Sequence, residues 1–154
     1  MLSVLTMLTA FGTSATTAFA ADGTLHFNSG ETIAYGDYYT TRMMFDGENT
    51  AYCLEPLKKT PAAGEYEYNL LPQDSPIRKA LYYLNGGYGY ETITRDQCFH
   101  GWSDTDAYVI GHLTVAYIYD NYNDAGGAFY GAPQNFIDKT KEVVGVINSL
   151  PELV

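Results

Sequence analysis

Basic side chains are scarce in this chain. Its 154 residues include 8 lysines and arginines against 18 aspartates and glutamates, which gives a formal net charge of −10. Nucleic-acid-binding proteins need a basic surface, because contacts to phosphates dominate their affinity. The charge balance therefore excludes a nucleic-acid partner, and it disfavours contact with an anionic membrane surface.

An apolar run long enough to cross a bilayer is also missing. Residues 1–20 carry no charge and end in Ala18-Phe19-Ala20, the A-x-A pattern of a signal-peptide cleavage site. The apolar part of this segment is too short for a membrane span. We therefore predict that residues 1–20 are an export signal and that residues 21–154 form one domain without membrane insertion. The alternative is a buried N-terminal strand or helix.

Cysteine is rare as well, with only Cys53 and Cys98. Together with His26, His100 and His112 they form no C-x-x-C or H-x-x-x-H pair, so neither a metal site nor a cofactor is expected. In an exported protein the two cysteines can form a disulfide. The other interpretation is that one of them is a reactive thiol.

The first third of the mature chain has the pattern of β-strands. Residues 25–27 are a short candidate, and β-branched and aromatic residues mark residues 32–39, 40–45 and 50–54. Asp46–Asn49 has the composition of a hairpin turn. The pattern predicts antiparallel strands in a sandwich or barrel-like arrangement.

Helix signals dominate the rest of the chain. Ser75 and Pro76 are a cap and a first-turn residue for a helix over residues 77–84. Pro133 opens a later, amphipathic helix. With the central helix described next, about three helices follow the strands, so the predicted fold class is α+β.

The central helix is predicted from about Ala107 to Tyr119. Ser103 and Asp106 have the spacing of a capping box before it. The helix is apolar nearly all round, so we expect it to be buried in the middle of the domain. Gly111 in its interior costs helix stability and predicts the close approach of another backbone.

The order of three motifs is specific. Tyr52-Cys53-Leu54 ends a strand, Ala80-Leu81-Tyr82-Tyr83 lies in the first helix, and Asp104–Tyr108 opens the central helix. In this order and spacing, over about residues 24–150, the chain resembles the thioester domain at the tips of Gram-positive surface adhesins. The resemblance implies a domain at the cell surface or in the cell wall that attaches to a host or neighbouring surface protein.

In that family a cysteine after an aromatic residue is joined to a glutamine side chain of the later helix as a buried internal thioester. A lysine amine of the partner can attack its acyl group and become covalently attached. Burial protects the thioester from water until that amine arrives.

Residue by residue, the resemblance places Cys53 at the family's cysteine position, after Tyr52. The glutamine position falls on His112, in Gly111-His112-Leu113-Thr114. Imidazole has no acyl carbon, so Cys53 and His112 cannot form a thioester. Either the chain is a variant without the standard bond, or another glutamine supplies the carboxamide, with Gln97, in the loop before the helix, as the nearest candidate.

Cys53 and His112 suggest a second hypothesis. If the fold brings them together, they form a thiol–imidazole pair of the kind used in acyl transfer or hydrolysis. Glu55 and Asp106 are the candidates for a third, orienting group. The plainer interpretation of His112 is a buried histidine bonded to a backbone carbonyl.

Tyrosine is abundant, with 15 residues. Tyrosine serves equally in strands and in protein- or sugar-binding surfaces, and Tyr52, Tyr88 and Tyr90 are the candidates for binding.

The leading hypothesis is a reactive-cysteine adhesion domain rather than an enzyme. The alternatives are a Cys53–His112 acyl-transfer or hydrolytic enzyme, and a non-covalent tip domain with a Cys53–Cys98 disulfide.

Overall fold

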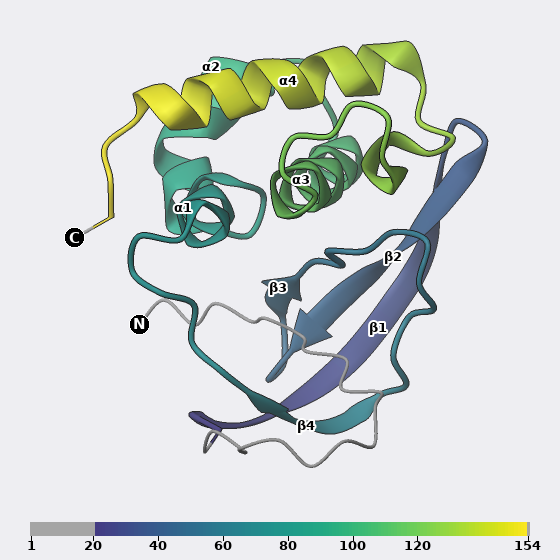
Figure 1. Ribbon diagram of the computed structural model, residues 1–154, viewed down its shortest axis with the longest axis vertical. Coiled ribbons are helices and arrows are strands. Elements are labelled where there is room, and N and C mark those ends of the chain that lie inside the picture. Colours follow the sequence, from purple (N-terminus) through teal and green to yellow (C-terminus); the bar gives the residue numbers. More distant parts are fainter. Residues whose placement is uncertain (1–20, 154) are drawn as a thin grey trace.

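A computed structural model describes residues 21–153; the predicted export signal lies outside the described residues. The chain forms two layers, a four-stranded antiparallel sheet and a group of helices that covers one face of it (Figure 1). The predicted α+β class is confirmed. The expected sandwich or barrel is wrong, because helices and not a second sheet cover the apolar face of the strands. That residues 21–154 are one domain stays a prediction.

The strands pair in the order β3-β2-β1-β4, all antiparallel. Their bounds are β1 Gly23–Tyr35, β2 Tyr38–Phe45, β3 Asn49–Ala51 and β4 Gly64–Tyr68. β1 continues through the predicted break at residues 28–30, which becomes a register irregularity between Ser29 and Thr32. β4 was not predicted, since it is short and lies in a segment rich in turn residues.

The turn between β1 and β2 was not predicted from the sequence. The predicted strand over residues 32–39 is interrupted at Gly36 and Asp37, where the chain reverses. Gly36 has a φ of +58°, and a β-carbon there would collide with the carbonyl oxygen of Gly131. Only glycine fits this close approach without strain.

Four α-helices follow the strands, one more than the expected three. They are α1 Pro76–Tyr83, α2 Arg95–Cys98, α3 Asp104–Tyr119 and α4 Gln134–Ser149, with a π-helical turn η1 over Tyr90–Thr94 and a 3₁₀ turn η2 over Gly127–Phe129. The two predicted caps are present: Ser75 accepts a hydrogen bond from the Arg78 amide, and Ser103 from the Asp106 amide. The short α2 was not predicted, because the sequence there shows neither a helix-capping residue nor a helical periodicity of apolar residues.

α3 is the centre of the molecule. Every residue from Ala107 to Ile118 is buried, and the helix lies between the sheet and α4 (Figure 1). A helix with no polar face can bury all its sides only in such a position, as predicted. The sheet adds a small apolar cluster of its own, against which Cys53 packs.

Candidate functional site

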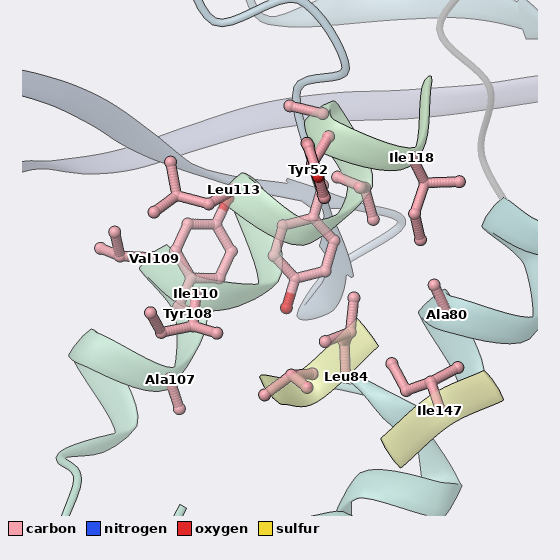
Figure 2. Packing of buried hydrophobic residues seen from close by; sticks show 14 of the residues in the cluster. Tyr52, Ala80, Leu84, Ala107, Tyr108, Val109, Ile110, Leu113, Ile118 and Ile147 are labelled. Atoms are coloured by element: carbon pink, nitrogen blue, oxygen red, sulfur yellow. The ribbon is translucent and has the colours of Figure 1, made fainter. Parts of the chain in front are cut away.

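Tyr108 of α3 holds the helix to the edge of the sheet. Its hydroxyl accepts a hydrogen bond from the Met43 amide of β2 at 2.9 Å and donates one to the Ala51 carbonyl of β3 at 2.9 Å. Its ring stacks on that of Tyr52, with centroids 4.9 Å apart, and the two rings lie side by side in Figure 2. The end of β3 is thereby fixed over the first half of α3.

Gly111 makes room for this packing. A β-carbon there would lie 2.7 Å from Cζ and 2.8 Å from Cε1 of Tyr52. The predicted close approach therefore exists, but the neighbour is an aromatic ring and not another backbone. The Tyr52 hydroxyl also donates to the Asn85 carbonyl at 2.5 Å. Since Cys53 is the next residue, these contacts determine where its thiol lies.

Cys53 and His112 line the same pocket, which has a volume of about 440 Å³. Its walls come from β2, from the chain after Cys53 and from α3. The remaining lining residues are Tyr38, Tyr39, Thr40, Thr41, Met43, Pro56, Leu57, Lys58, Lys59 and Thr60. Within residues 21–153, neither a carboxylate nor a carboxamide side chain belongs to this lining. The fold thus places Cys53, two residues after the end of β3, and His112 of the central helix on one pocket.

The Cys53 thiol is half-buried. Sγ donates a hydrogen bond to the Glu55 carbonyl, with an S···O distance of 3.2 Å. Burial raises the pKa of Cys53, and the Glu55 contact and the Lys58 charge act in the opposite direction. Because burial dominates, Cys53 is a protonated thiol at neutral pH and needs a base to become a nucleophile.

His112 is only 1% exposed. Burial lowers its pKa to about 4, and the nearby Cys53 carbonyl partly offsets this. The imidazole is therefore neutral at neutral pH. Tyr35 at the end of β1 places its hydroxyl 3.4 Å from Nε2. The backbone carbonyl expected beside a buried histidine is that of Cys53, which raises the pKa of the ring, although Nδ1 makes no hydrogen bond of good geometry.

Tyr35 was missed by sequence reasoning. It alternates with Ile33 on the buried face of β1, which marks it only as a core residue. Its contact with His112 joins residues 77 positions apart. No local pattern in the sequence could have indicated this pairing.

The two candidates for an orienting group do not contact His112. The Glu55 carboxylate pairs with Lys58, 2.9 Å from its Nζ, and only the Glu55 main chain contacts Cys53. Asp106 lies in the first turn of α3, six residues before His112 and so about 9 Å along the helix axis. The structure does not bring a carboxylate to the imidazole.

Cys98 lies elsewhere in the fold. It is buried at the end of α2, where its carbonyl accepts a hydrogen bond from Lys139 of α4 at 2.8 Å. Both cysteines are free thiols in the structure. The Cys53–Cys98 disulfide considered as an alternative is therefore absent. Cys98 does not line the pocket that Cys53 lines.

Glutamine also stays away from Cys53. Gln97 belongs to α2 rather than to a loop, and it is exposed, as are Gln73 and Gln134. None of the three lines the pocket. In residues 21–153 no carboxamide is therefore placed for a thioester with Cys53.

Of the three tyrosines expected to bind, two are in the core. Tyr52 and Tyr90 are buried, whereas Tyr88 is 67% exposed. The tyrosines that reach the pocket are Tyr38 and Tyr39, which line its wall. The sequence could not separate packing tyrosines from surface tyrosines.

Comparison with models of protein families matches residues 24–154 to the thioester domain. The chain therefore belongs to the thioester-domain family, in agreement with the resemblance seen in its motifs. No curated protein and no solved structure matches it. In the described part of the chain, every helix is too short or too polar to cross a bilayer. The same residues contain no group of three potential metal ligands.

Proposed function

We propose that this chain is a cell-surface adhesion domain of a Gram-positive bacterium, exported and held at the cell wall, which attaches to a protein on a host or neighbouring cell. The attachment site is the Cys53–His112 pocket. Family membership supports the adhesion role. One observation carries the site: Cys53 and His112, which the resemblance places at the family's cysteine and glutamine positions, line one pocket.

Attachment through the pocket uses Cys53 as a free nucleophile. The family's internal thioester needs a carboxamide beside the thiol, and His112 stands in its place. The neutral imidazole can instead accept the thiol proton when an electrophile enters. The pocket is therefore an acceptor of acyl groups, where the family's usual site is a donor.

A second function uses the same pair. A thiol and a neutral imidazole that line one pocket are also what an acyl-transfer or hydrolytic enzyme needs. The two functions differ in turnover: an enzyme releases product repeatedly from an activated ester, whereas an attachment domain retains the acyl group or its partner.

The test restores the family's chemistry with His112→Gln. The variant is expected to lose the mass of one ammonia and to take up methylamine, because the introduced side chain would then present its carboxamide to Cys53. Wild type is expected to have its unmodified mass, and Cys98→Ala in the His112→Gln background should leave the result unchanged. Cys53→Ala in that background should abolish it.

Two results would contradict the proposal. The first is a wild-type protein that already lacks one ammonia and takes up methylamine through Cys53. The second is a folded His112→Gln protein, checked by circular dichroism, with an unmodified mass. The adhesion role itself is tested by coating beads with wild-type or Cys53→Ala protein and counting the beads that stay on target cells after a denaturing wash.

A further inference from the structure

An amine lies on the same pocket as the thiol and the imidazole. The chain turns after Cys53, and the Lys58 amide donates to the Glu55 carbonyl at 3.0 Å. The same carbonyl accepts the hydrogen bond from the Cys53 thiol. This turn brings Lys58 back to the pocket wall, close enough that the Lys58 charge and Cys53 each influence the other's pKa.

His112, which lines the same pocket, has a ring nitrogen without a close hydrogen-bond partner. Nδ1 of His112 is buried without a partner, and such atoms are rare in native proteins. A ring nitrogen without a close hydrogen-bond partner can accept a hydrogen bond or a proton from a ligand in the pocket. A carboxamide or the ammonia it releases can form that hydrogen bond.

We propose that the pocket takes an acyl group from a glutamine carboxamide of the partner protein and transfers it to Lys58 of this chain. This rests on the proposed function, in which the pocket is the attachment site. It reverses the roles in the family: here the partner supplies the carboxamide and the domain supplies the amine. The product is an isopeptide bond between partner and domain.

The first step forms a thioester between the two proteins. His112 takes the proton from Sγ while the sulfur attacks the carboxamide carbon of the partner's glutamine. The new C–S bond replaces the C–N bond, and the imidazolium returns its proton to the departing ammonia. Partner and domain are now joined through Cys53.

The second step moves the acyl group to nitrogen. The Glu55 carboxylate, 2.9 Å from Nζ, takes a proton from the Lys58 ammonium, and the free amine attacks the thioester carbon. A C–N bond forms, the C–S bond breaks, and the second amine proton goes to the sulfur. Glu55 then releases its proton to water. In sum, a carboxamide and a lysine give an isopeptide and ammonia, with no oxidant or reductant.

Lys58 and not Lys59 is the acceptor. Both line the pocket, but only Lys58 has a carboxylate beside it and influences the pKa of Cys53. The ion pair raises the pKa of Lys58, so the second step should become faster as pH rises through the lysine range. Lys59 provides a matched control one residue away.

The experiment incubates the full chain with the glutamine peptide carbobenzoxy-Gln-Gly at about pH 9, where lysine starts to lose its proton. Intact mass is expected to rise by the peptide minus one ammonia, and fragmentation should place the peptide on Lys58. Lys59→Arg should label like wild type. Lys58→Arg, which keeps the charge, should lose the stable label, and Cys53→Ala should lose all labelling.

An unlabelled wild type, a label on Lys59, or a label on Lys58 that persists in Cys53→Ala would each overturn the proposal. The parallel His112→Gln measurement separates the two levels of inference. Methylamine uptake by that variant without peptide labelling of wild type rejects transfer to Lys58 and leaves the attachment site standing. Failure of both rejects both.

Discussion

Replacing Gly111 by alanine tests the packing that positions Cys53. The new β-carbon would lie 2.7 Å and 2.8 Å from two ring atoms of Tyr52. The ring cannot easily move, because it stacks on Tyr108 and its hydroxyl is bonded to Asn85. We therefore take the upper part of the range for overpacking, about 3 kcal/mol. The better helix propensity of alanine returns about 1 kcal/mol, which leaves a net loss of about 2 kcal/mol.

Gly145→Ala is the matched control. Gly145 also lies inside a helix, α4, but a β-carbon added there would have no neighbouring atom within 4 Å. The same substitution there gains helix propensity without a collision and should stabilise the protein by roughly 0.5–1 kcal/mol. The changes in the free energy of unfolding of the two variants are therefore expected to have opposite signs.

Thermal unfolding and urea titration measure both variants. For a domain of this size, 1 kcal/mol corresponds to a Tm change of roughly 3–5 °C. The Tm of Gly111→Ala should fall by about 6–10 °C. Because Tyr52 and Cys53 are adjacent, alkylation of Cys53 in the folded variant should proceed at a changed rate. A Gly111→Ala protein as stable as wild type would refute the reasoning, because Tyr52 could not then lie on the helix.

Two further predictions concern buried polar groups. The pKa of His112 is about 4 in the fold against 6.5 when unfolded, so the unfolded state binds more protons between these values. The contribution of His112 to the free energy of unfolding should therefore be fully present above about pH 6.5 and fall by up to about 3 kcal/mol as pH drops towards 4. Tm measured against pH in wild type and in His112→Gln isolates this contribution. Equal slopes of Tm against pH in the two proteins would contradict it. Tyr108→Phe leaves the Met43 amide unpaired and should cost about 1–3 kcal/mol in a urea titration, whereas Tyr130→Phe, at an exposed ring, should leave the midpoint unchanged.

Helix starts and the central position of α3 could be predicted because they depend on neighbouring residues. Ser75 and Ser103 cap the helices they precede, since capping joins a side chain to an amide three residues away. The apolar surface of residues 107–118 left no face for solvent. Cys53 and His112 were predicted as site residues from the order of motifs that carries the family resemblance. The properties of neighbouring residues alone would not have selected them.

Features that depend on distant pairing could not be predicted. Residues 64–68 form β4 because they pair with the free edge of β1. The sequence of that turn-rich segment does not indicate which strand it pairs with. Tyr35 and His112 meet only after the sheet packs on α3. Gln97 was the candidate carboxamide because it precedes α3 closely in sequence. In the structure it lies on the short α2 and is exposed to solvent.

Burial has opposite consequences for the two site residues, and this bears on when the pocket reacts. It raises the pKa of Cys53 and lowers that of His112, so the pair rests as thiol and imidazole rather than as thiolate and imidazolium. A resting thiolate would react readily with any small electrophile or oxidant. Under the proposed function, a neutral pair reacts only when an acyl carbon is held in the pocket long enough for proton transfer and attack to occur together. Selectivity for a bound partner then follows from the burial of the two side chains, and the rate of Cys53 alkylation by iodoacetamide should be slower in the folded protein than in urea.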